Sequence, residues 1–121
     1  MAKPDAIPSA PRHLSPAMKR WWRDVVSTFE LESHDQRLLQ SACEAWDRGQ
    51  EARALIERDG LVVATANGGM KRHPAVAIEH ECRIGFARLL RELALGVEPP
   101  AEAARPPMLR SVRRRGGFDA A

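Results

Sequence analysis

Residues 33–60 read SHDQRLLQSACEAWDRGQEARALIERDG, and the rest of the fold is arranged around this segment. Its small and apolar residues recur every three or four positions, which is the spacing of one face of an α-helix. Ser33 and Gln36 have the spacing of a capping box, and Gly60 is placed to end the helix in the left-handed region. The stretch predicts a helix of about 24 residues, roughly 36 Å long. So long a helix needs a partner along its whole length, either a second helix of the chain or a neighbouring subunit.

Two further helices are predicted, one on each side of this stretch. Ser15-Pro16 can cap and begin a helix that ends near Glu30, and His73-Pro74 can begin another that Gly96 closes. Between the long helix and the last one, Leu61–Thr65 favours extended structure and residues 67–69, Asn-Gly-Gly, tolerate positive φ. We therefore expect a short β-hairpin that returns through residues 70–72.

Two glycines lie on the apolar faces of the predicted helices. Gly49 and Gly85 would each cost about 1 kcal/mol relative to alanine if they only filled space. We expect them to let the second and third helices approach closely as an antiparallel pair. The alternative is that these glycines have no structural role.

Composition supports one small helical domain. The chain has 121 residues, 44% of them hydrophobic, which is enough for one modest core. Prolines gather in the first 12 residues, and prolines with arginines gather after residue 96. We expect an all-α fold with a flexible arm at 1–14, a helical oligomerisation core at 15–96 and a flexible Pro/Arg-rich tail at 97–121.

The net charge of +3 is small, so the placement of the basic residues is more informative than their number. Positive charge gathers in the tails and in the connection between the second and third helices, a layout that suits nucleic acid or an acidic protein. The arginine-rich tail can contact phosphates or dock on an acidic surface, and a solubilising tail without a target is the remaining reading. The candidate DNA-binding residues are Lys19, Arg20, Arg23, Lys71, Arg72, Arg110, Arg113, Arg114 and Arg115.

Catalytic signatures are absent from the sequence. The Asn67–Lys71 segment lacks the spacing of a phosphate-binding loop, and His80-Glu81-Cys82 lacks the second histidine of a zinc protease motif. Glu44, Asp47 and Glu51 alternate with arginines, which favours a salt-bridged helix surface over a metal site. We expect no catalysis, no metal, no cofactor and no small-molecule substrate.

Cys43 and Cys82 are interpreted as buried free thiols. No apolar run approaches the roughly 18 residues of a membrane span, and no leader opens the chain, so a cytosolic protein is expected.

Adjacent tryptophans are the most distinctive feature of the first helix. Trp21 and Trp22 are separated by about 100° around the helix, so they do not point at the same spot in a thin core. Either both are core residues, or one faces a neighbouring subunit. The candidate subunit-interface residues are Trp21, Trp22, Val25, Phe29 and Trp46.

Read in order, eight segments of residues 10–96 resemble the small terminase subunits of tailed double-stranded DNA phages. These segments are Pro11–Ser15 with Lys19–Trp22, Leu31–Asp35, Leu38-Leu39, Ala42–Arg48, Asp59-Gly60, His73–Ala75 and Phe86–Leu93.

The resemblance implies a non-enzymatic subunit of phage genome packaging in the bacterial host cytoplasm. Such a subunit assembles as a ring, recognises viral double-stranded DNA and delivers it to a large terminase subunit that carries the ATPase and nuclease. Many relatives place a helix-turn-helix first, but here a rod more than twice as long replaces the expected recognition helix. DNA contact is therefore expected from the tails and basic rims. The alternatives are a small dimeric DNA-binding regulator and a helical protein–protein scaffold without a nucleic-acid role.

Overall fold

The computed structural model describes residues 7–94 and 113–114, and it confirms a mainly helical chain with an antiparallel helix pair. The elements, in chain order, are α1 (Pro16–Thr28), β1 (Phe29–Glu30), α2 (Ser33–Asp59), β2 (Val62–Ala64), β3 (Met70–Arg72), α3 (Pro74–Leu93) and β4 (Arg113–Arg114). Helix α2 has 27 residues, so its predicted length is confirmed.

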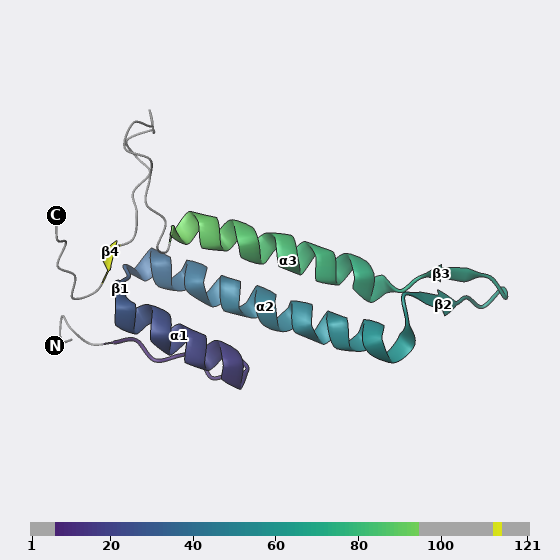
Figure 1. Ribbon diagram of the computed structural model, residues 1–121, viewed down its shortest axis with the longest axis horizontal. Coiled ribbons are helices and arrows are strands. Elements are labelled where there is room, and N and C mark those ends of the chain that lie inside the picture. Colours follow the sequence, from purple (N-terminus) through teal and green to yellow (C-terminus); the bar gives the residue numbers. More distant parts are fainter. Residues whose placement is uncertain (1–6, 95–112, 115–121) are drawn as a thin grey trace, which may run out of the picture.

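Helices α2 and α3 run antiparallel and are packed along their length, while α1 lies beside the first half of α2 only (Figure 1). We call the end where α1 leads into α2 the proximal end, and the opposite end, where β2 and β3 project beyond the helices, the distal end. The distal half of the molecule is therefore only two helices thick.

The core lies at the proximal end, where all three helices meet. Its buried side chains are Leu14, Met18, Trp22, Val25, Val26, Leu39, Cys43 and Leu93. Leu14 belongs to this core, and the carbonyl of Pro8 accepts a hydrogen bond of 3.1 Å from the Trp22 indole. Pro8 and Leu14 thus contact the helices. The sequence predicts a flexible arm over residues 1–14 because contacts of this kind have no local signature.

Gly49 is a close-contact position between α2 and α3, as predicted. A Cβ atom at residue 49 would lie 3.3 Å from the Cβ of Cys82. The prediction for Gly85 is wrong, because a Cβ atom there would meet nothing within 4 Å. Small side chains continue the seam toward the distal end, where Ala52 and Ala75 are buried.

The helix ends follow the predicted chemistry at three places and differ at two. Ser15 caps α1 and His73 caps α3, each by accepting a backbone N–H, and Gly60 ends α2 with φ +88°. The amino end of α2 differs, because Glu32 is the cap and Asp35 its capping-box partner, in place of Ser33 and Gln36. Gln36 instead donates to the carbonyl of Leu31 at 3.4 Å.

The carboxyl end of α3 also differs from the prediction. Ala94 takes a left-handed conformation with φ 56°, and its N–H bonds back to the carbonyls of Leu90 and Arg91. Gly96, the predicted helix stop, lies outside the described residues.

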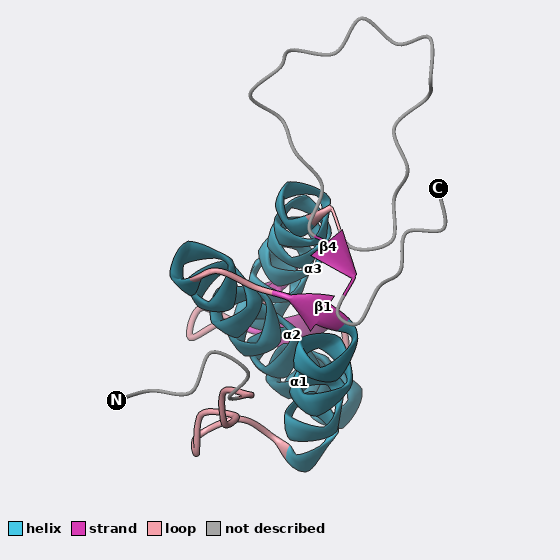
Figure 2. Cartoon of the chain, turned by 90° about the vertical axis from the view of Figure 1, so that its left-hand side faces the viewer, coloured by secondary structure: helices cyan, strands magenta, loops and turns pink. Residues whose placement is uncertain are grey.

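Two small antiparallel sheets occupy opposite ends of the molecule. At the distal end β2 and β3 form the predicted hairpin, with Val62 opposite Arg72 and Ala64 opposite Met70. At the proximal end β1 pairs with β4, which brings Arg113 and Arg114 beside Glu30 and Phe29 (Figure 2). Within the described part of the chain, no helix is both long and apolar enough to span a bilayer.

Candidate interaction surfaces

Helix α1 presents cations on the side away from its buried face. Arg20 and Arg23 are exposed and stand one turn apart, and Lys19 is half-buried. Within residues 7–94, none of the three forms an ion pair with a carboxylate, whereas Arg48 and Arg58 of α2 do. The positive charge of α1 is thus available to an anionic partner.

The hairpin of β2 and β3, which we call the ribbon (residues 61–72), carries both charge and exposed apolar surface. Lys71 and Arg72 are exposed, and Leu61 and Met70 are 65% and 64% exposed. Directly opposed residues share a face and successive residues alternate, so Val62, Ala64, Met70 and Arg72 lie on one face, opposite to Lys71. We call this the Met70 face.

A three-residue network joins α2 to α3 at the base of the ribbon. The Nδ1 atom of His73 accepts the N–H of Ala75 at 2.9 Å, so the proton is on Nε2, which donates to Asp59 at 2.9 Å. The guanidinium of Arg58 donates two hydrogen bonds to the same carboxylate, at 2.7 and 2.8 Å. Hydrogen bonds from Arg58 and then His73 hold the pKa of Asp59 well below its usual range. Sequence reasoning did not find this network, whose only signal is His-Pro after an Asp-Gly helix end.

Three aromatic rings connect the three helices near the middle of the molecule. The ring of Phe86 lies 5.8 Å from Trp21 and 5.2 Å from Trp46, both in tilted arrangements that aromatic pairs favour. Trp46 is nevertheless 39% exposed. It is a large, rigid side chain held in place from one side and open to solvent on the other.

The other candidate interface residues are mostly inside the single chain. Trp22 and Val25 are buried in the proximal core, and Phe29 packs against it. Trp21 is half-buried. Of the five candidates, Trp46 therefore offers the most surface to a partner.

An open groove of about 810 Å³ runs from Trp46 along α2 toward the start of α1. We call it the Trp46 groove, and its lining residues are His13, Ser15, Ala17, Glu44, Trp46, Asp47, Arg48, Gln50, Glu51 and Ala54. Three carboxylates against one guanidinium leave its walls with a net charge of −2 when His13 is neutral.

Contacts inside the Trp46 groove fix the positions of its carboxylates. Asp47 accepts the N–H of Ser15 at 2.8 Å, and Glu51 pairs with Arg48 at 3.2 Å. Glu44 accepts hydrogen bonds from Gln40 and His13, which together lower its pKa. The net negative charge of the walls, together with the exposed Trp46 ring, makes the groove suited to a cationic, partly apolar partner.

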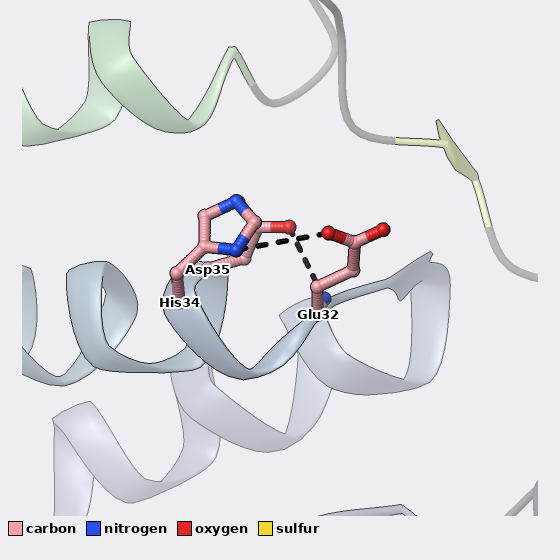
Figure 3. Close-up of side chains that lie close together, drawn as sticks. All are labelled: Glu32, His34 and Asp35. Atoms are coloured by element: carbon pink, nitrogen blue, oxygen red, sulfur yellow. Dashed lines mark hydrogen bonds and ion pairs between the residues drawn. The ribbon is translucent and has the colours of Figure 1, made fainter.

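A second group of side chains, Glu32, His34 and Asp35, comes together at the amino end of α2 (Figure 3). Its possible ligand atoms lie within 4.8 Å of one another. Asp35 is buried and accepts the N–H of Glu32 at 3.1 Å, and His34 lies 3.4 and 3.6 Å from the two carboxylates. Helix capping accounts for this arrangement.

The two thiols differ in their surroundings. Cys43 is fully buried, and burial together with the charges of Asp47 and Glu44 raises its pKa to about 12. Cys82 is half-buried next to Gly49. The expected buried thiol is confirmed for Cys43.

The arginine-rich segment is only partly described. Arg113 and Arg114 form β4 and pair through their backbone with β1, a contact that local sequence patterns do not predict. Arg110 and Arg115 lie outside the described residues. The structure therefore places part of this segment at the proximal end, far from Lys71 and Arg72 at the distal end (Figure 1).

Comparison with known proteins supplies the family. No curated protein and no solved structure matches the chain. A model of the family described as phage terminase, small subunit, matches residues 18–105. This match covers all of α1 except its first two residues, together with the long helix pair and the ribbon. The chain therefore belongs to the phage terminase small subunit family.

Proposed function

We propose that this protein is a non-catalytic adaptor of viral genome packaging that works as a ring in the cytoplasm of the bacterial host. In this role it recognises viral double-stranded DNA and delivers it to the large terminase subunit, which carries the ATPase and nuclease. The observation that carries the proposal is the family match over residues 18–105.

Exposed apolar side chains on the distal half support self-association. Helix α1 does not cover this half, and small residues hold α2 against α3 there. Leu55 and Ile78 are left exposed on the two long helices. Apolar surface of this kind marks protein–protein contact, and neighbouring copies would cover it.

The surface of α1 supports DNA binding. Lys19, Arg20 and Arg23 can approach phosphates without first breaking an ion pair to residues 7–94. Contacts to phosphates give affinity and position but carry no sequence information directly. In a ring each copy would add the same three cations, so a modest charge per chain becomes a continuous basic rim.

The remaining partner, the large subunit, is assigned to one of the tails. The tail arginines Arg110, Arg113, Arg114 and Arg115 can serve DNA or an acidic surface of the motor. Lys71, which the sequence also suggested, stays a candidate DNA contact, whereas for Arg72 we propose a protein partner.

Mass and salt dependence together test the proposal. Size-exclusion chromatography with light scattering should give a closed oligomer at about 10–50 µM, the range in which weak to moderate interfaces assemble. A strictly monomeric protein at these concentrations would contradict the proposed ring.

DNA affinity should fall steeply as salt rises. Each phosphate contact contributes about −0.9 to the slope of log K against log salt. Arg20→Ala/Arg23→Ala should make the slope shallower, and the matched control Arg88→Ala/Arg91→Ala on exposed positions of α3 should leave it unchanged. Equal slopes for the wild type and both variants would contradict DNA contact by α1.

A further inference from the structure

The ribbon has the features of a plug. It projects beyond the helices at the distal end (Figure 1), and its Met70 face combines two large apolar side chains, Val62 and Met70, with the guanidinium of Arg72. All three are exposed. A water-facing apolar strand face is costly to leave uncovered, and natural proteins usually protect such strands.

The Trp46 groove has the complementary features of a socket. Trp46 supplies a large apolar wall, Ala17 and Ala54 leave room beside it, and the walls carry a net negative charge. Thioether sulfur packs favourably against aromatic rings, which suits Met70. Tryptophan surrounded by weaker contacts is also the usual composition of an interface hot spot.

Plug and socket do not meet within one chain. The ribbon extends away from the helices, whereas the groove lies between the middle of α2 and the start of α1. Two different surfaces that complement each other join copies head to tail, and such contacts close into rings when the rotation permits.

We infer that the Met70 face of each copy docks in the Trp46 groove of the next copy. Met70 and Val62 pack on Trp46, and Arg72 lies among the carboxylates of the groove. This inference rests on the proposed self-association and assigns its surfaces. The hydrogen bond between Asp59 and His73 joins α2 to α3 at the base of the ribbon.

Single substitutions on adjacent ribbon residues test the contact. Arg72→Glu on the Met70 face should raise the concentration for half-assembly by about 30-fold, the effect of losing one interface hot spot. The matched control is Lys71→Glu, which makes the same charge change one residue away on the opposite face and should have a much smaller effect. Circular dichroism melts of both variants show whether the fold is intact.

A complementation experiment tests the head-to-tail geometry. The plug variant Met70→Glu/Arg72→Glu keeps its groove, and the socket variant Gln50→Arg/Ala54→Arg keeps its ribbon. Each should be monomeric alone, but an equimolar mixture should form a particle of twice the subunit mass. Arginines introduced at Ser41 and Ala87, exposed positions outside the groove, should not block assembly.

The outcomes separate this inference from the ring itself. A monomeric wild type removes the proposed ring. If the wild type is oligomeric and both the plug variant and the socket variant keep the same mass, the docking is wrong, although the ring is not contradicted. If Lys71→Glu and Arg72→Glu weaken DNA binding equally and leave the mass unchanged, the ribbon is a DNA contact, and the inference is wrong.

Discussion

The absence of a side chain at Gly49 allows α2 and α3 to approach closely. Helices α2 and α3 approach closely where Gly49 faces Cys82, since a Cβ atom at residue 49 would lie only 3.3 Å from the Cβ of Cys82. Gly85 lies on the predicted apolar face of α3, as Gly49 does on that of α2, yet a Cβ atom at residue 85 would meet only open space. We therefore expect substitutions at the two glycines to change the stability of the fold in opposite directions.

Gly49→Leu should destabilise the fold by about 1–3 kcal/mol, because the larger side chain forces α2 and α3 apart. Gly85→Ala should instead stabilise it by about 0.5–1 kcal/mol, because alanine favours the helix and meets no neighbour. Thermal melts of both variants beside the wild type provide the measurement. A Gly49→Leu variant as stable as the wild type would show that the helices do not pack closely at Gly49.

Cys43 should behave as an inert thiol in the folded protein. Its pKa is raised to about 12 by burial and then by Asp47 and Glu44, so almost no thiolate is present at pH 8. Iodoacetamide should modify residue 43 only after denaturation, which mass spectrometry of the peptides can follow. Rapid alkylation in the native state would mean that the proximal core opens readily.

The same shift gives a direction to the pH dependence of stability. Between about 9 and about 12 the unfolded chain releases the thiol proton while the folded chain keeps it. The contribution of the Cys43 thiol to the free energy of unfolding is fully present below about pH 9. The free energy of unfolding should therefore fall as the pH rises from about 9 to about 12. Cys43→Ala should flatten this part of the curve, whatever it costs in packing.

At the scale of elements, α3 depends on one residue at its amino end. The side chain of His73 accepts the N–H of Ala75 and donates to Asp59. Pro74, at the first helical position, has no N–H that needs a cap. One imidazole thus caps α3 and anchors it to the last residue of α2.

His73→Ala should lower the free energy of unfolding by about 1 kcal/mol or more, because it removes the cap. His73→Asn should recover most of the loss, since asparagine is a good cap, but it should not restore the bond to Asp59. Urea denaturation of both variants separates the two roles. Should the alanine variant match the wild type, capping by His73 contributes nothing.

The helices could be predicted from sequence because their signals are local. Serine and proline at positions 15 and 16, the apolar periodicity and Gly60 are all recognised within a few residues. The sequence places the cap of α2 one residue too late, because serine is a commoner N-cap residue than glutamate. Glu32 caps the helix because it forms a capping box with Asp35.

The interaction surfaces could be predicted only in part. The exposed cations of α1 and the ribbon follow from charge in the sequence. In contrast, the Trp46 groove joins residues from two segments, and β1 pairs with a strand more than eighty positions away. Contacts of this kind leave no periodic pattern in a single sequence. Trp22 and Trp46 illustrate the same limit, because only the packing shows that the first is buried and the second exposed.

At the scale of the whole molecule, stability should be uneven along the long axis. The proximal end has a three-helix core, whereas the distal end relies on small residues between two helices and leaves Leu55 and Ile78 exposed. Amides with few buried contacts exchange more readily.

Hydrogen exchange should therefore be slower in α1 and at the start of α2 than in residues 50–80 of a dilute, monomeric sample. Raising the protein concentration should protect residues 50–80 selectively, because neighbouring copies would cover them. Mass spectrometry of peptides at two concentrations makes the comparison. Protection that does not depend on concentration would argue against subunit contacts at the distal half.

The bond between Asp59 and His73 also has a kinetic consequence. It closes a loop of 14 residues, whereas the contact between Trp46 and Phe86 spans 40, the difference of the two residue numbers. Loop-closure entropy makes the longer contact costlier by about 1 kcal/mol when each is formed first. The helix pair should therefore nucleate at the ribbon and zip toward the aromatic rings, so that His73→Ala slows refolding while Trp46→Ala chiefly speeds unfolding.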